Sequence, residues 1–237
     1  MRTLAIVPAF DEEGSVGGVV RELRALGGVD VVVVNDGSRD ETSRVAREAG
    51  AVVLDLPFNL GIGAAVQTGY QWARDHGYDV AVQVDGDGQH LASEIPRLLA
   101  PIAAGAADLV LGSRYVERTD YRASRSRRAG MLMFSALVSA ATGRRFHDTT
   151  SGFRAASRPV IRYLALHYPQ DYPEVEALVL LSRAGFRVTE VACEFRERVT
   201  GQSTITPVRS AYYVVKVSLA ILLGLLRSVP APEDPGA

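Results

Sequence analysis

The stretch VAVQVDGDGQH, residues 80–90, joins an apolar run to a turn that holds two carboxylates. The run Val80–Val84 is apolar on both faces, as in a strand of a parallel sheet that helices cover on both sides. Asp85 and Asp87 come directly after it, with only glycine between and after them. Ligands of open α/β sheets bind beyond the carboxyl ends of the strands. The stretch therefore predicts a buried parallel strand that ends in a ligand site.

Similar apolar runs lie on both sides of this one in the sequence. They are Leu4–Val7, Val31–Val34, Ala51–Leu54 and Leu109–Leu111. Helical patterns separate the runs, at Gly14–Leu26, Asp40–Ala49, Gly61–Asp75 and Ala92–Ala104. Strands that alternate with helices form sheets covered by helices on both faces. We therefore expect an α/β fold with a doubly wound, mostly parallel sheet in the first 115 residues.

The composition argues against several classes of protein. The 237 residues carry a formal net charge of −1, which is unlike a protein that coats nucleic acid. The single cysteine, Cys193, excludes an internal disulfide and a CxxC metal site. Residues 2–9 contain too short an apolar run for a signal peptide, so we expect a cytoplasmic protein. The apolar segment 211–226 has 16 residues, fewer than the roughly 20 of a membrane span, and predicts a buried or membrane-surface helix.

The sequence changes character after about residue 115. Six arginines lie within residues 114–128, before an apolar helix that we expect at Met131–Ala141. Beyond a turn-rich segment, the patterns predict helices at Pro159–Leu166 and Val175–Ala184, a strand at Arg187–Val191, a loop at Arg196–Ser203 and a disordered tail from Pro230. Arginines beside an apolar helix suit peripheral contact with the inner face of a membrane. The alternative is a solvated basic face above helices that pack into the core.

The polar residues at the strand ends each have two interpretations. Asp85 and Asp87 suit a divalent metal on a diphosphate, because Mg²⁺ combines one or two carboxylates with substrate phosphates; the alternative is an Asp- and Gly-rich turn. Asp36 suits hydrogen bonds to a base or ribose, or the N-cap of the next helix. The glycines of residues 59–63 suit a phosphate-binding loop or close packing of helix and strand.

Taken together, these motifs resemble those of family 2 glycosyltransferases, which have the GT-A fold. PAFDEE at 8–13 is similar to the family's P-x-[YF]-N-E, VVNDGS at 33–38 to its D-x-S motif, NLGIGAA at 59–65 to N-x-G-x-[GA], and DGDGQH at 85–90 to DxDxQ. GSRY at 112–115, DTTSGFR at 148–154, Glu176, Glu190 and RVTGQS at 198–203 resemble the subgroup of dolichyl- and polyprenyl-phosphate mannose or glucose synthases. The resemblance covers about residues 3–205.

The resemblance implies an inverting, metal-dependent transfer of a hexose, mannose or glucose, from a GDP- or UDP-sugar to a polyprenyl phosphate. It implies a GT-A domain at 1–205, a C-terminal apolar helix at 206–229 and a tail at 230–237. The nucleotide sugar would be held by Pro8, Phe10, Glu12, Val34, Asp36, Asp85 and Gly86, and Mg²⁺ or Mn²⁺ by Asp85, Asp87 and Gln89. The catalytic residues would be Asp87, Arg114 and Arg198, with the two arginines on phosphates of donor or acceptor.

One position departs from the family pattern. The closing loop usually reads R-x-x-G-x-S-K, and Thr204 stands in the place of the lysine. This keeps open a transferase that acts on a sugar or small-molecule hydroxyl, for which a base such as Asp148 or Glu176 would be needed. No single residue stands out as that base, which favours an acceptor phosphate that is already anionic. A non-catalytic nucleotide-sugar binder is the third hypothesis.

Overall fold

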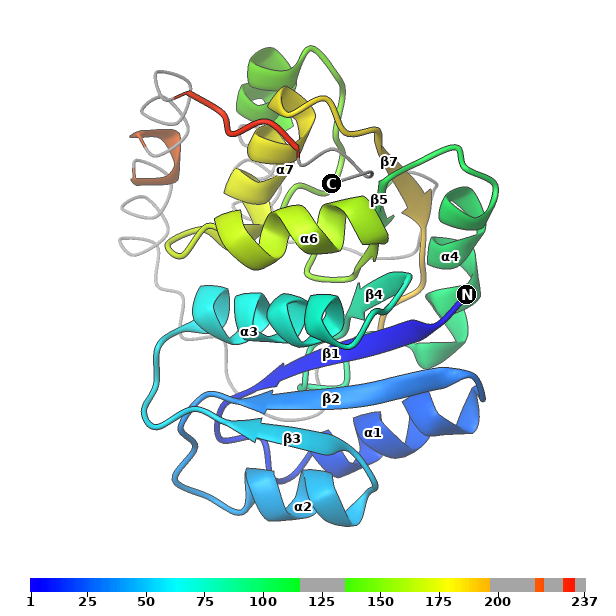
Figure 1. The fold of residues 1–237 in the computed structure, drawn as a ribbon, viewed down its shortest axis with the longest axis vertical. Helices are drawn as coiled ribbons and strands as arrows, with labels where there is room; N and C mark the ends of the chain where they lie inside the picture. Colours follow the sequence, from blue (N-terminus) through cyan, green and yellow to red (C-terminus); the bar gives the residue numbers. More distant parts are fainter. Residues whose placement is uncertain (116–134, 197–215, 220–227, 233–237) are drawn as a thin grey trace.

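The computed structural model of the chain describes residues 1–115, 135–196, 216–219 and 228–232. In these ranges a seven-stranded sheet lies between two layers of helices (Figure 1). The strands are β1 (Thr3–Ala9), β2 (Val29–Asn35), β3 (Val52–Asp55), β4 (Val80–Gln83), β5 (Leu109–Ser113), β6 (Arg154–Ser157) and β7 (Val188–Ala192). Their order is β3-β2-β1-β4-β6-β5-β7, with β6 antiparallel to β4 and β5 and the other described neighbours parallel. The predicted mostly parallel α/β sheet is therefore confirmed.

The helices cover both faces of the sheet, as a doubly wound fold requires. One face is covered by α1 (Val16–Ala25), α2 (Thr42–Glu48) and α4 (Ile95–Ala103), which comes after a short 3-10 turn, η1 (Ala92–Glu94). The other is covered by α3 (Ile62–Asp75), α6 (Arg158–His167) and α7 (Pro173–Arg183). Successive side chains of a strand point to opposite faces. In β1, Ala5 and Val7 accordingly pack with the first set of helices, and Leu4 and Ile6 pack with the second.

β3 differs from the expectation that every strand is apolar and covered on both faces. It is the edge strand of the sheet, and Val52 at its start is 49% exposed. Its pairing with β2 begins at Val32, so residues 29–31 of β2 lie without a β3 neighbour. Each residue of β3 is exposed or half-buried, because the strand has one neighbour and less of its apolar area is covered. The prediction of a strand here is confirmed, and that of its burial is wrong.

β6 is the strand that the sequence pattern did not predict. Its four residues, RAAS, come after the segment DTTSGF, which has the composition of a turn. Strand propensity comes mainly from β-branched and aromatic residues, which RAAS lacks. Gln83 at the end of β4 and Leu111 in β5 both pair with Arg154, the first residue of β6. The turn before β6 therefore reaches the same edge of the sheet as the loops after β4 and β5.

The C-terminal elements are described in part. Residues 135–142 are helical and overlap the helix expected at 131–141, and residues 216–219 are helical, with Val217 buried. The Tyr163 hydroxyl donates a hydrogen bond to the carbonyl of Pro230 at 3.0 Å, so the chain returns to α6. The boundary expected at 205 and most of the arginine-rich segment lie outside the described residues. Among the helices that are described, none has the length and apolar character to span a membrane.

Candidate active site

The loop after β4 places the two predicted metal ligands at the carboxyl edge of the sheet. The side chain of Asp85 is 37% exposed, and Asp87 Oδ1 accepts a hydrogen bond from the backbone N–H of Gln89 at 3.0 Å. Gly86 between them is buried, and a Cβ there would lie 3.1 Å from the carbonyl oxygen of Pro8. A glycine is therefore what lets this loop pass against the end of β1. The acidic loop and the predicted nucleoside residues of β1 are neighbours.

His90 holds Asp85 from the buried side of the loop. Its Nδ1 accepts the backbone N–H of Asp85 at 3.0 Å, and its Nε2 lies 3.5 Å from Asp85 Oδ2. Because Nδ1 is an acceptor, the neutral ring carries its proton on Nε2 and directs it toward the carboxylate. The ring is 6% exposed and stacks on Phe153 with 4.7 Å between centroids. Burial lowers the pKa of His90. The carboxylates of Asp85 and Asp87 act in the opposite direction and raise it, but their effect is smaller.

Asp36 joins three segments at the end of β2. Its N–H donates to the carbonyl of Ala9 at 2.9 Å. Its carboxylate, in a side chain only 4% exposed, accepts the N–H groups of Leu60 at 2.7 Å and Gly61 at 2.9 Å. The N-cap of α2 is Glu41, so the capping alternative for Asp36 is wrong. No motif in the sequence indicates that this carboxylate binds the loop before α3.

The loop at residues 59–63, before α3, has part of its backbone already engaged by a carboxylate. The N–H groups of Leu60 and Gly61 already donate to Asp36. Gly63 lies against the chain after α6, where a Cβ would be 2.8 Å from the carbonyl oxygens of Pro169 and Gln170. Gly63 therefore packs closely, against the chain after α6 and not against a strand, whereas a Cβ on Gly61 would meet nothing within 4 Å. Phosphate binding by this loop stays a prediction.

The other predicted nucleoside residues lie at the ends of β1 and β2. Pro8 and Val34 are buried and pair with each other across the two strands. Phe10 is 43% exposed, at the point where β1 gives way to a loop. Glu12 Oε2 accepts the hydroxyl of Ser15 at 2.6 Å, next to the start of α1. The structure thus brings these four residues to one end of the sheet, and their contact with a nucleoside remains a prediction.

Arg114 comes after β5 and is held by a buried carboxylate. Its Nε lies 2.8 Å from Asp148 Oδ2 and its Nη2 lies 3.2 Å from Oδ1, and Asp148 has no exposed surface. The guanidinium carbon lies 5.1 Å from the centroid of the Phe195 ring, which also meets His90 edge-on. Arg114 is therefore fixed beside the acidic loop, with 22% of its side chain exposed. Arg198 lies outside the described residues.

Both candidate bases for a hydroxyl acceptor have other partners. Asp148 forms the ion pair with Arg114 and also receives the Thr150 hydroxyl at 3.3 Å. Glu176 Oε1 accepts the N–H of Tyr172, the N-cap residue of α7, at 3.1 Å. A general base needs a lone pair directed at the substrate proton. These contacts support the interpretation in which the acceptor brings its own negative charge.

The donor set after β4 fits a divalent cation that shares its ligands with a substrate. The described residues contain no group of three or more His, Cys, Asp or Glu side chains gathered as for a metal. Two carboxylates of one loop are what Mg²⁺ needs when phosphate oxygens and water supply its other positions. The side chain of Gln89 is half-buried, and its role as a third protein ligand stays a prediction.

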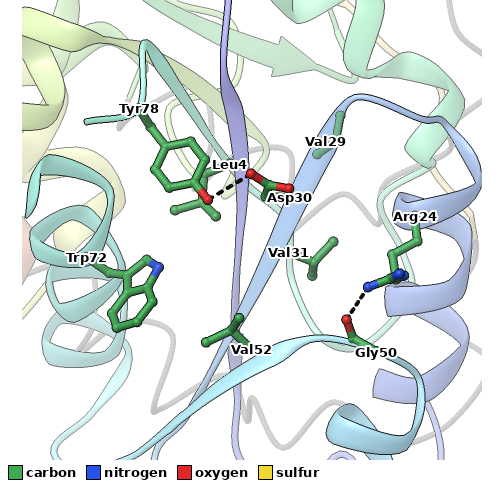
Figure 2. A pocket seen from close by; sticks show the side chains of 9 residues that line it. All are labelled: Leu4, Arg24, Val29, Asp30, Val31, Gly50, Val52, Trp72 and Tyr78. Carbon is green, nitrogen blue, oxygen red and sulfur yellow. Dashed lines mark hydrogen bonds between the residues drawn. The ribbon is translucent and has the colours of Figure 1, made fainter. Parts of the chain in front are cut away.

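A separate pocket of about 360 Å³ lies at the opposite end of the strands (Figure 2). Its wall includes Leu4 and Val29, near the starts of β1 and β2, with Trp72 from α3. Figure 2 shows the Tyr78 hydroxyl donating to Asp30 across it, at 2.9 Å. The pocket exists where β3 starts too late to pair with residues 29–31 of β2. It is distinct from the acidic loop and from every predicted site residue.

Comparisons with known proteins agree with this geometry. The family model described as glycosyl transferase family 2 matches residues 4–164. A polyprenol monophosphomannose synthase of Mycolicibacterium smegmatis is 35% identical over 86% of this chain and 81% of its own. An undecaprenyl-phosphate mannosyltransferase of Micrococcus luteus is 33% identical over 87% of this chain and 88% of its own. The crystal structure of glucosyl-3-phosphoglycerate synthase from Mycobacterium tuberculosis, in complex with Mn²⁺, UDP and phosphoglyceric acid, shares the fold with a TM-score of 0.72 at 22% identity, covering 98% of this chain and 80% of that one.

Proposed function

We propose, from the premise that this chain belongs to glycosyl transferase family 2, that it transfers a hexose from a nucleoside diphosphate sugar to a polyprenyl phosphate. The observation that carries the proposal is the loop of Asp85 and Asp87 beside the ends of β1 and β2, with Arg114 fixed next to it. The relatives from Mycolicibacterium smegmatis and Micrococcus luteus are both named for joining mannose to a polyprenyl phosphate, so mannose is the hexose that we expect.

In this proposal the nucleoside lies at the ends of β1 and β2, and Asp85 and Asp87, with Gln89 nearby, hold Mg²⁺ or Mn²⁺ on the diphosphate. A bound divalent cation neutralises charge that develops on the leaving diphosphate. Arg114 would add a fixed positive charge, and its orientation is set by Asp148. Preorganised charges of this kind lower the barrier because they need no rearrangement during the reaction.

The acceptor phosphate would attack C1 of the hexose. A C1–O bond to the acceptor forms as the C1–O bond to the diphosphate breaks, on the opposite side, which inverts the configuration at C1. A phosphate monoester has a second pKa of about 6 and is mostly dianionic at neutral pH, so no protein base is required. The engagement of Asp148 and Glu176 in other hydrogen bonds supports this acceptor over a neutral hydroxyl.

The test is a matched pair of acceptors with the full-length chain. GDP-mannose, GDP-glucose, UDP-glucose and UDP-mannose are each offered with Mn²⁺ and either a short polyprenyl phosphate or the same polyprenol without phosphate. We expect a metal-dependent glycolipid with the phosphate and none with the alcohol, and the productive donor identifies the base. Transfer to the alcohol or to a soluble sugar, with none to the phosphate, would overturn the acceptor; binding of donors without any turnover would overturn the enzyme activity.

We propose in addition a peripheral contact with the membrane that carries the acceptor. The arginines of 114–128 and the apolar segment 211–226 support it by their composition. Each basic residue near an anionic surface contributes on the order of 1 kcal/mol, which salt screens. The chain should therefore sediment with anionic liposomes at low salt and less at high salt. Absence of sedimentation at low salt would show that these segments do not bind the surface.

A further inference from the structure

Gln83 carries a buried donor that has no partner. It is the last residue of β4, it is 1% exposed, and its Nε2 makes no hydrogen bond with any described residue. Its Oε1 receives the Tyr168 hydroxyl at the long distance of 3.5 Å. A buried amide donor left without an acceptor is unfavourable, because the group has lost its hydrogen bonds to water. Such a group has either a structural water or a ligand as its missing partner.

The orphaned amide lies next to a predicted metal ligand. Gln83 ends β4 and contacts Tyr168, on the side of the sheet that α3 and α6 cover, and Asp85 follows two residues later in the loop. A Cβ on Gly152 would lie 3.1 Å from Gln83 Nε2 and 2.9 and 3.0 Å from the two carboxylate oxygens of Asp85. The amide and the carboxylate therefore pack against the same backbone, and the glycine is what lets both side chains lie so close to it.

The residues packed near Gln83 and Asp85 are polar and charged. Arg154 is 2% exposed and donates from Nε to the carbonyl of Ser151 and from Nη2 to that of Glu174, both at 2.7 Å. Burial raises the pKa of Glu174, while Arg154 opposes the shift and Asp85 adds to it. A buried arginine, a half-buried carboxyl group and an unpartnered amide near the predicted phosphate site are donors and acceptors of the kind that sugar hydroxyls require.

We propose that Gln83 recognises the hexose of the donor by donating its Nε2–H to one sugar hydroxyl. This inference rests on the proposed function, because a hexose linked to a diphosphate at Asp85 and Asp87 must have its ring within a few ångströms of Asp85. Gln83 would then be a specificity-determining residue, and the identity of the sugar would depend on which hydroxyl reaches the amide. A site built to hydrogen-bond a hydroxyl discriminates strongly against a substrate that lacks it.

The variant Gln83→Met tests this, since it keeps the length of the side chain and removes the donor. We expect kcat/KM for the productive donor to fall about tenfold or more, as a lost hydrogen bond predicts, while binding of the nucleoside diphosphate with Mn²⁺ stays unchanged. Stability should change little, because the amide donor has no partner among the described residues, and the oxygen that is lost with it accepts only the long 3.5 Å contact from the Tyr168 hydroxyl. The control is Ser157→Ala, which removes a similarly unpartnered hydroxyl at the far end of β6.

Deoxy donors make the test specific. Removal of one hydroxyl should harm the wild type as much as Gln83→Met does, and the two losses should not add for that hydroxyl alone. Gln83→Asn, whose side chain is one methylene group shorter, should also lose activity, and its loss should be non-additive with the removal of the same hydroxyl. Additive losses with every deoxy donor, or a drop in melting temperature with unchanged sugar preference, would mean that the amide binds a structural water, and would overturn the inference alone. A wild type that binds no nucleoside diphosphate would overturn the proposed function with it.

Discussion

Replacement of Asp36 by asparagine removes one of the two acceptors that hold the loop between β3 and α3. In the wild type, the two carboxylate oxygens accept the N–H groups of Leu60 and Gly61 at 2.7 and 2.9 Å. Asparagine offers one oxygen and one NH₂ group, so one backbone N–H would face a donor. The side chain is 4% exposed, which leaves little access for water to take the lost place.

The size of the effect can be worked out from these contacts. A hydrogen bond to a charged group contributes about 1.5–3 kcal/mol, and a buried N–H left without an acceptor costs a similar amount. We therefore expect Asp36→Asn to lower the free energy of unfolding by about 2–4 kcal/mol. For a chain of this size, that corresponds to a fall in melting temperature of roughly 5–10 °C. Affinity for nucleoside diphosphate should fall too, because the loop borders the predicted nucleoside site.

Urea unfolding and calorimetric titration of a nucleoside diphosphate with Mn²⁺ measure the two effects separately. The matched control is Asp87→Asn, in which the remaining oxygen can still accept the N–H of Gln89. Its stability should stay within about 1 kcal/mol of the wild type. If Asp36→Asn unfolds like the wild type but has lost its nucleotide affinity, the carboxylate serves the ligand and not the loop, and the reasoning is refuted.

Three other expectations concern turnover and reactivity. Asp87→Asn should lower metal-dependent turnover at least about 100-fold with an unchanged far-UV spectrum; near-normal activity would contradict its role as a metal ligand. Burial raises the pKa of the Cys193 thiol to about 12, so at pH 8 only roughly 1 in 10⁴ is thiolate, and iodoacetamide should modify the folded chain far more slowly than the chain in urea. Thr204→Lys, in the segment outside the described residues, should raise initial rates with polyprenyl phosphate, because a cation offsets repulsion between two phosphate groups; a gain confined to hydroxyl acceptors would count against the phosphate acceptor.

Much of the fold could be predicted because local patterns and tertiary burial agree in the first half of the chain. Apolar runs such as Val31–Val34 lie in strands that helices do cover on both faces, so the pattern of the sequence reflects the environment. β6 fails this rule. Its residues, three small ones and the buried Arg154, lie between β4 and β5, where burial comes from neighbouring strands and helices that the local sequence does not reveal.

The site could be predicted as a set of motifs but not as a set of contacts. The acidic pair after β4 is evident from its position behind an apolar run. The bond from Asp36 to the loop at Leu60 and Gly61 joins residues 24 and 25 positions apart, and no periodic pattern encodes such a pair. The contact between His90 and Asp85 could not be predicted either. A histidine after DGDGQ looks the same in the sequence whether it binds a metal or accepts the backbone N–H of Asp85.

The antiparallel strand β6 also has a consequence for the order of folding. In the described sheet, β5 and β7 connect to β1–β4 through β6, and β6 lies about 70 residues after β4 in the chain. Contacts between distant segments form late, since they require the closure of a long loop. The first four strands, which bring together the predicted nucleoside residues and the acidic loop, can assemble while the ribosome is still synthesising the C-terminal half of the chain. Arg114 and Asp148 would join them after β6 has docked. The part of the site predicted to hold the nucleoside and the metal would therefore form before the ion pair of Arg114 and Asp148.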